Sequence, residues 1–189
     1  MASTYPTSLD TFTNPTATSL LTSPSHAQQH SDINDAMEAV QTKLAIGNTV
    51  IGTYIDHSTA MSFPGGVTVG NGTKTAYYCQ VNNFVHFYGK FTLGSTSAIT
   101  GPIQLGLPIN MDSFMVATGQ PFGLVYYQDA SAGTLVPSDA ISVGSATTVY
   151  TSVTNTAGTY ASRVNASATV PFTWAVSDTF FWNLYYKAA

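Results

Sequence analysis

The stretch Asn83-Phe-Val-His-Phe-Tyr-Gly-Lys-Phe-Thr-Leu93 decides the fold class. Its side chains alternate with the two-residue period of a β-strand. Large apolar residues stand on both faces of this strand, with Val85 and Phe87 on one face and Phe84 and Tyr88 on the other. This pattern predicts that both faces of the sheet are covered, and another copy of the chain is one candidate for the second cover.

The same β character extends over residues 48–189. Residues 179–187 form a second clear strand pattern, and Thr, Val and aromatic residues alternate with turn-forming Gly, Pro and Asn throughout. About ten short strands separated by such turn-forming residues predict a mainly β protein whose C-terminal knob is a β-sandwich of jelly-roll type. The other expected strands cover residues 49–55, 67–69, 75–80, 103–107, 114–118, 123–128, 147–153 and 168–174.

Residues 25–47 have a helical pattern instead. Ser25 can cap the start of this helix, and Gly47 can end it. Its inward positions are spaced 4-3-4-3-4, which favours the seam of a coiled coil over an amphipathic helix packed on its own domain. These positions are His26, His30, Ile33, Met37, Val40 and Leu44. Because β-branched Ile33 and Val40 fall at d positions, a coiled coil of three or more helices is favoured over one of two. The predicted core of this homotrimer is Ile33, Met37, Val40 and Leu44.

Residues 1–24 are rich in Ser and Thr and contain three prolines, so we expect neither a helix nor a core of their own. A disordered tail is the plain alternative. We interpret the segment as an extended arm that attaches the protein to a larger particle. Its expected anchors are the large apolar side chains of Phe12, Leu20 and Leu21.

The composition argues against several classes of protein. Of 189 residues, 44% are hydrophobic and 7% are charged, with a net charge of −4. The five Lys and Arg are scattered, whereas nucleic-acid binding requires a basic stripe. The single cysteine, Cys79, argues against an intrachain disulfide and a zinc site. No long apolar run suggests a signal peptide or a membrane span, and we expect no cofactor.

His26 and His30 have the i,i+4 spacing that puts two imidazoles on one helix face. Three chains could then hold a metal between them. The favoured interpretation is that these histidines hydrate the N-terminal end of the coil. Ala27 stands where the zinc-protease motif H-E-x-x-H requires Glu.

No motif predicts catalysis, so the sequence favours a protein that is not an enzyme. The G-x-S-x-G nucleophile motif is absent, and residues 70–75 are expected to form a hairpin turn rather than a phosphate loop. His86 is expected to pack in the core or between chains. Tyr126, Tyr127 and Trp174 could stack on sugars, although core packing is favoured for most aromatic residues. The acids of the β region are too dispersed to indicate a glycosidase pair: Asp56, Asp112, Asp129, Asp139 and Asp178.

The order of arm, helix and β knob resembles structural proteins of tailed bacteriophages, notably those that infect actinobacteria. The helix segment Ser23-Pro-Ser-His-Ala-Gln-Gln-His-Ser-Asp-Ile-Asn-Asp-Ala-Met-Glu-Ala-Val-Gln41 and the ending Trp182-Asn-Leu-Tyr-Tyr-Lys-Ala-Ala189 carry part of the likeness. Further similar stretches are residues 9–15, 69–73, 78–82 and 91–98. The family has no shared catalytic motif.

This resemblance implies a virion protein, namely a homotrimeric fibre or knob displayed on the particle surface that binds the host cell surface through its loops. The alternative is a head decoration protein that coats or stabilises the capsid, and a glycan depolymerase is a weaker one. The expected partners are two further copies of the chain, capsid or tail proteins that hold the arm, and a host-surface glycan. Neither nucleic acid nor membrane insertion is expected.

Overall fold

The computed structural model describes residues 26–44, 52–118, 121–141 and 145–189. The chain divides into two compact units, Met1–Thr53 and Tyr54–Ala189, which we call the helical unit and the β domain. The predicted arm, residues 1–24, lies outside the described residues together with its anchors and the helix stop expected at Gly47.

Among the described residues of the helical unit, α1 (His26–Leu44) is the only helix or strand. It confirms the helix predicted within residues 25–47. In the single chain, Ile33 is 56% exposed, Met37 is 55% exposed and Val40 is 36% exposed. The predicted seam is thus open to solvent in one copy, and the side chain of Leu44 lies outside the description.

The β domain contains one large antiparallel sheet and a two-stranded ladder, so the protein is mainly β as predicted. The ladder pairs β2 (Val67–Thr68) with β5 (Ala98–Ile99). The strands of the large sheet are β1 (Ile55–Asp56), β3 (Thr73–Val81), β4 (Phe84–Thr92), β6 (Gln104–Gly106), β7 (Pro121–Asp129), β8 (Thr134–Ile141), β9 (Thr148–Asn155), β10 (Ser162–Asn165) and β11 (Thr179–Lys187).

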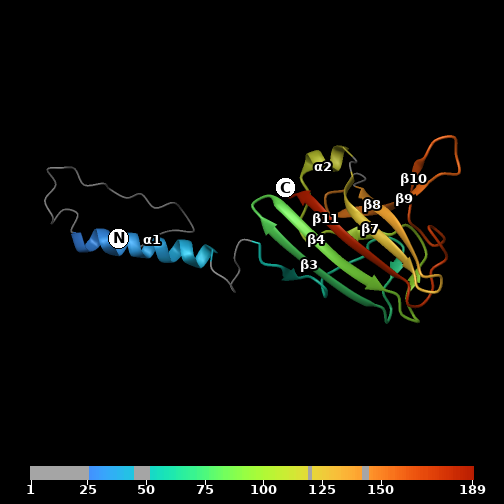
Figure 1. Cartoon of the computed structure of the whole chain (residues 1–189), viewed down its shortest axis with the longest axis horizontal. Helices are drawn as coiled ribbons and strands as arrows, with labels where there is room; N and C mark the ends of the chain where they lie inside the picture. Colours follow the sequence, from blue (N-terminus) through green and yellow to red (C-terminus); the bar gives the residue numbers. More distant parts are fainter. Residues whose placement is uncertain (1–25, 45–51, 119–120, 142–144) are drawn as a thin grey trace. The chain divides into compact units, whose positions relative to one another are not determined.

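These nine strands follow the order β1-β3-β4-β11-β7-β8-β9-β10, and β6 also pairs with β9 (Figure 1). The hairpin between β3 and β4 turns at Asn82, whose φ of 52° suits asparagine. Strand β11 lies between β4 and β7 and pairs with both along most of its length. The middle of the sheet therefore joins segments that are far apart in the sequence.

The core lies on one face of this sheet, which we call the inner face. Alternate residues of β11 point into it, and all are at most 2% exposed. This alternation confirms the two-residue period predicted for residues 83–93 and 179–187. The inner face of the three central strands carries Val85, Phe87, Phe91, Val125, Tyr127, Phe180, Trp182, Leu184 and Tyr186.

Segments outside the central strands cover the inner face. They supply buried apolar side chains that belong to the same hydrophobic cluster, so this face is sealed by the chain itself. The covering residues include Met61, Phe63, Leu93, Ile99, Ile103, Leu105 and Met111.

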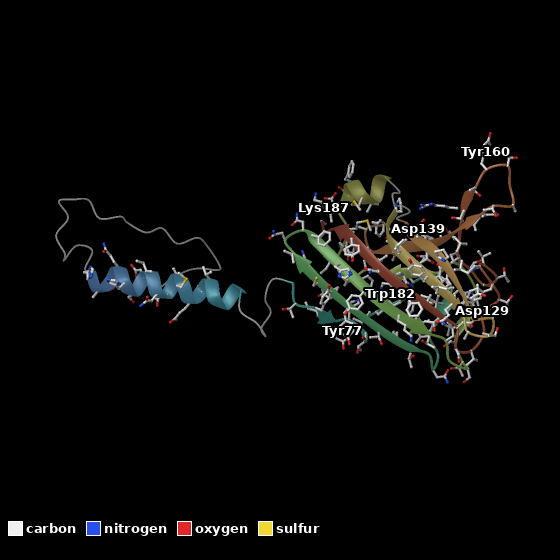
Figure 2. The ribbon with its side chains drawn as sticks, viewed as in Figure 1. Tyr77, Asp129, Asp139, Tyr160, Trp182 and Lys187 are labelled. Atoms are coloured by element: carbon white, nitrogen blue, oxygen red, sulfur yellow. The ribbon has the colours of Figure 1, made fainter. Side chains whose placement is uncertain are left out.

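Trp182 of β11 is labelled in Figure 2, and the register places Gly89 of β4 directly opposite it. A Cβ atom at Gly89 would clash with the indole of Trp182 and with the carbonyl oxygen of Thr75. Because position 89 has only hydrogen there, the indole can pack over the backbone of β4. The same indole ring packs against Phe87 at 5.8 Å and Phe63 at 6.2 Å between centroids.

Two of the predicted strands are wrong. Residues 114–118 form part of α2 (Ser113–Thr118), because Asp112 accepts a hydrogen bond from the Phe114 amide at 2.9 Å and caps a helical turn. Residues 168–174 form no strand, because Ser167 and Val170 close a turn there instead. Of the strand expected over residues 49–55, the described part contains only the first residue of β1.

Three strands were not predicted, namely β5, β8 and β10. Pro137 lies inside β8 and argues against a strand in the sequence, because proline cannot donate to a ladder. In the structure β9 pairs only with residues 139–141 of β8, so Pro137 lies where β8 has β7 as its single neighbour. Its missing amide hydrogen therefore removes no hydrogen bond to β9.

The segment at residues 70–75 runs from a turn into β3 and contains no helix N-terminus that could form a phosphate loop. The turn is as predicted, but it does not close a hairpin, because β2 before it pairs with β5 and not with β3. Asn71 fixes the turn by accepting a hydrogen bond from the Thr96 amide at 2.9 Å. Its own amide donates to the Thr96 hydroxyl at 2.9 Å. Two loops at this end of the sheet are thereby joined.

We expect Gly89→Ala to lower the free energy of unfolding of the full chain by about 1–3 kcal/mol, because the new methyl group overpacks the contact with Trp182. Urea unfolding followed by tryptophan fluorescence measures this change. Gly158→Ala is the matched control, since its Cβ would lie 3.6 Å from the nearest atom. Equal stability of both variants would contradict the packing described for Trp182.

Candidate functional site

The outer face of the large sheet is aromatic and open to solvent. The register places Tyr77, Tyr88 and Asn183 in one row across β3, β4 and β11, and Cys79, His86 and Tyr185 in the next. Among the described residues, Tyr54 is the only aromatic residue outside these strands whose ring packs on the two rows, against His86 and Tyr88. The sequence predicts that both faces of the sheet are covered. The chain itself covers the inner face. Large apolar side chains of this face that are 45% to 55% exposed are Phe84, Leu124, Leu135 and Tyr185.

His86 is the centre of a cluster on this face. Its ring stacks on Tyr185 with a centroid distance of 4.4 Å and an interplanar angle of 4°, and on Tyr88 at 5.5 Å. Its Nδ1 lies 2.5 Å from the hydroxyl oxygen of Tyr54, and its Nε2 lies 2.8 Å from Oδ1 of Asn183. Stacking and hydrogen bonds together hold this ring in one orientation.

The proton positions in the cluster follow from Tyr54. Desolvation by burial raises the pKa of its hydroxyl, and the neighbouring Cys79 raises it further. The hydroxyl therefore keeps its proton at neutral pH and donates it to Nδ1 of His86. The Nε2 atom of His86 is hydrogen-bonded to Oδ1 of Asn183 on its other side. The cluster is a hydrogen-bonded platform.

A hollow of about 380 Å³ opens on the same face, lined by Tyr126, Gln128, Leu135 and Phe181. Phe181 lies between Lys90 of β4 and Tyr126 of β7 in the register. The Nζ atom of Lys90 is 5.6 Å from the centre of the Phe181 ring, a cation–π contact. The hollow thus has two aromatic walls, an amide and a nearby cation.

The charges on this face are unbalanced. Among the described outer residues of β3, β4, β7, β8 and β11, Asp139 of β8 is the one carboxylate, and Lys90 and Lys187 are the two lysines. Asp139 is already paired with Arg163 at 2.8 Å. Lys187 is paired with Asp112 at 3.0 Å. Among the described residues, no carboxylate lies within ion-pair distance of Lys90. The face therefore presents one unpaired positive charge beside its aromatic hollow.

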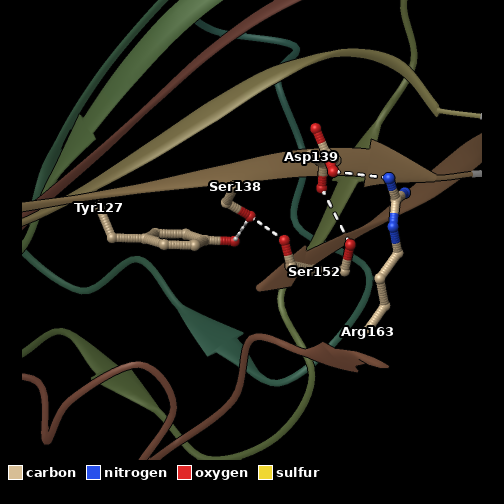
Figure 3. Close-up of polar contacts among 5 residues, drawn as sticks. All are labelled: Tyr127, Ser138, Asp139, Ser152 and Arg163. Atoms are coloured by element: carbon tan, nitrogen blue, oxygen red, sulfur yellow. Dashed lines mark hydrogen bonds and ion pairs between the residues drawn. The ribbon is translucent and has the colours of Figure 1, made fainter. Parts of the chain in front are cut away.

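Asp139 illustrates how the aspartates of the β domain are used (Figure 3). Its carboxylate pairs with Arg163 at 2.8 Å and so links β8 to β10 across β9. The backbone beside it is tied by the Ser138 hydroxyl, which donates to the Ser152 carbonyl and lies 3.4 Å from the hydroxyl of Tyr127. Burial raises the pKa of Tyr127, which stays protonated in the core.

Three further aspartates accept hydrogen bonds that lower the pKa of their carboxyl groups. A general acid in glycoside hydrolysis needs a raised pKa, so these groups have the opposite property. Ser58 lowers the pKa of Asp56, Lys187 that of Asp112, and Ser131 that of Asp129.

Asp178 is 1% exposed and joins two loops. Its Oδ1 accepts from the Ala130 amide at 2.9 Å, and its Oδ2 accepts from the Ala175 amide at 2.7 Å. All five aspartates singled out in the sequence therefore have local contacts that account for their positions.

The histidine pair in α1 is brought together as its spacing predicts. The Nε2 atoms of His26 and His30 lie 3.0 Å apart, and both side chains are hydrogen-bonded and exposed. Among the described residues, no group of three or more His, Cys, Asp or Glu gathers to hold a metal ion. In one chain the pair offers two nitrogen atoms, and any further ligand requires another source.

The aromatic residues singled out for sugar stacking separate into two groups. Tyr127 is fully buried in the core, and Trp174 packs on Tyr127 and donates from Nε1 to the Ser167 carbonyl at 2.8 Å. Tyr126 alone of the three lines the hollow on the outer face. His86, expected in the core or between chains, lies half-buried on that face.

Sequence reasoning missed Tyr54, Lys90, Phe181 and Asn183 as members of one surface. The alternation in residues 83–93 and 179–187 indicates which residues share a face of each strand. It does not indicate that β11 pairs between β4 and β7, which is what brings these residues together.

Comparison of the chain with protein-family models, curated proteins and solved structures gives no match. The resemblance to phage structural proteins therefore stays a prediction from the sequence. Within the described residues, neither helix has the length and apolar character needed to cross a bilayer.

We expect Asp178→Ala to lower the free energy of unfolding by about 1–3 kcal/mol, because two backbone amides lose their acceptor. Asp56→Ala is the control, since Asp56 is exposed and accepts from the Ser58 amide of its own turn. Urea unfolding of the full chain measures both. If the two variants lost equal stability, the structural role assigned to Asp178 would be wrong.

Proposed function

We propose that this chain is a non-enzymatic structural protein of a bacteriophage virion, which assembles as a homotrimer and displays its β domain at the particle surface. The observation that carries the proposal is the exposed apolar seam of α1. In this proposal each part of the chain has one role. The arm attaches the protein to the particle, the helix sets the three-fold symmetry, and the β knob faces outward.

The seam supports self-association on energetic grounds. Ile33 and Met37 are each more than half exposed in the single chain, although they repeat at coiled-coil spacing. A helix of 19 residues is marginally stable alone in water. Burial of such a side chain between helices contributes about 1.5–3 kcal/mol, so association would stabilise α1. The β-branched d positions, Ile33 and Val40, favour three helices.

Two features of the β domain support its role as a displayed knob. Its inner face is sealed by its own covering segments, as in a β-sandwich of jelly-roll type, which is the finer fold we propose. Its outer face carries exposed rings and few charges, as surfaces that meet a partner do. We assign this face to contact with the host cell surface.

The aspartates support a role without catalysis. Each of the five has a structural partner, and the three with a shifted pKa are held in the ionised form. A depolymerase requires two carboxylates with separate acid and base roles. The contacts of the five aspartates favour a structural role instead, in which they stabilise turns or link strands.

The first test is the mass of the assembled protein. Light scattering of the full chain should give about three times 20.0 kDa. Met37→Asp should yield monomers, because three carboxylates would face one another in the seam without counter-charges.

Ser31→Asp is the matched control for this experiment. It adds the same charge to an exposed position of α1 outside the seam, where a carboxylate near the helix N-terminus is tolerated. This variant should remain trimeric. A monomeric parent protein, or a trimeric Met37→Asp variant, would refute the coiled-coil assembly.

The second test concerns the ends of the molecule. Deleting residues 2–22 removes the proposed anchors Phe12, Leu20 and Leu21 but leaves α1 and the β domain. An extended arm binds by backbone hydrogen bonds and a few apolar anchors, so the truncated trimers should fold and no longer join the virion. Virion purification followed by immunoblotting measures incorporation. Normal incorporation would show that the arm is not the attachment element.

A further inference from the structure

One row of the outer face combines a cation with two aromatic rings. Lys90, Phe181 and Tyr126 are successive partners across β4, β11 and β7, and Pro137 of β8 continues the row. The hollow of about 380 Å³ lies beside this row, where Gln128 and Leu135 complete its lining. Its volume is in the range of small-molecule sites, about 300–1,000 Å³.

The chemistry of these side chains suits a sugar. The apolar C–H face of a pyranose packs on aromatic rings such as Tyr126 and Phe181. Sugar hydroxyls exchange hydrogen bonds with an exposed amide, which Gln128 supplies, and with the hydroxyl of Tyr126. An anionic substituent would be attracted to the exposed ammonium of Lys90, which has no carboxylate partner among the described residues.

We propose that this hollow binds an anionic glycan, a polysaccharide that carries carboxylate or phosphate groups. One sugar ring lies against Tyr126 and Phe181, and its anionic group meets the ammonium of Lys90. The inference deepens the proposed function, because it names the ligand and the site by which the displayed β domain would contact a cell surface.

The neighbouring cluster extends the site. Tyr88, His86 and Tyr185 form a stacked platform on the same face, and the hydrogen bonds to Tyr54 and Asn183 fix its polar atoms. Side chains that are already ordered lose little conformational entropy when a ligand binds. A polysaccharide bound in the hollow can therefore extend over this platform and contact both surfaces. A single sugar unit contacts only one of them.

A two-fold pairing of two copies through this face fits less well than a glycan. If two copies packed face to face, the same surface would meet itself. Asp139, the one carboxylate among the described outer residues of β3, β4, β7, β8 and β11, is already paired with Arg163, so each Lys90 would be buried without a free opposite charge. Burying an unpaired ammonium is strongly unfavourable. An anionic glycan supplies the missing charge.

The test is calorimetric titration of the full chain with three polymers: polygalacturonate, a glycerol-phosphate polymer and neutral dextran. We expect at least one anionic polymer to bind, and dextran to bind about tenfold more weakly or not at all. Binding should weaken at high salt, because the contact with Lys90 is solvent-exposed and screened. Which anionic polymer binds identifies carboxylate or phosphate as the recognised group.

Three variants locate the site. Tyr126→Ala should weaken binding about tenfold or more. Lys90→Gln should remove the preference for anionic polymers, and Lys90→Arg should retain it. Tyr160→Ala is the control, because Tyr160 is 84% exposed and lies between β9 and β10 (Figure 2). Thermal unfolding of each variant establishes that it is folded.

Three results would overturn the proposal: no binding of either anionic polymer, unchanged binding by Tyr126→Ala and Lys90→Gln, or equal loss in Tyr160→Ala. Light scattering on the same samples separates the alternatives. A change of oligomeric state in Tyr126→Ala would assign the face to a second copy. A trimer that binds no polymer refutes the glycan site alone, and a monomer refutes the assembly whether or not it binds.

Discussion

The β domain depends on the packing of Trp182 over the backbone at Gly89. This contact fixes the register of β11 against β4, and it brings the covering segment that holds Phe63 onto the same ring. Because side chains alternate along a strand, the register of the core also fixes which residues face outward. A shift by one residue would exchange Trp182 for Phe181 or Asn183, so the outer surface exists only as long as the core is correctly paired.

Scarce charge has shaped how the β domain is held together. Its aspartates bind backbone amides in turns, or pair with a nearby cation as Asp139 does with Arg163. Tyrosine, serine and asparagine make many of the remaining polar contacts, as in the hydrogen-bonded cluster around His86. With carboxylates used in this way, a single unpaired lysine on an aromatic face becomes the dominant local charge.

How far the sequence predicts this structure depends on the range of the interactions involved. The alternation in residues 83–93 and 179–187 is local, and it correctly indicated two central strands and their buried faces. Local propensity failed at residues 114–118, where the cap from Asp112 outweighs the β preference of Phe114 and Val116. It also failed at Pro137, whose position in β8 is tolerated only because of how β9 pairs. The outer surface could not be predicted, since Lys90 and Tyr126 meet Phe181 only through non-local strand pairing.

The place of β11 in the middle of the sheet has a consequence for the order of folding. During synthesis, β4 and β7 emerge from the ribosome well before residues 179–187, and the two strands have no hydrogen-bonded partner between them until then. Pairing over such sequence separations is slow, because the loop must close before any contact stabilises it. Until β11 arrives, the apolar edges of both halves stay exposed to other nascent chains. When the protein is produced rapidly, its incomplete chains would therefore need chaperones to prevent aggregation until β11 has paired. The stability of the finished sheet does not remove this need.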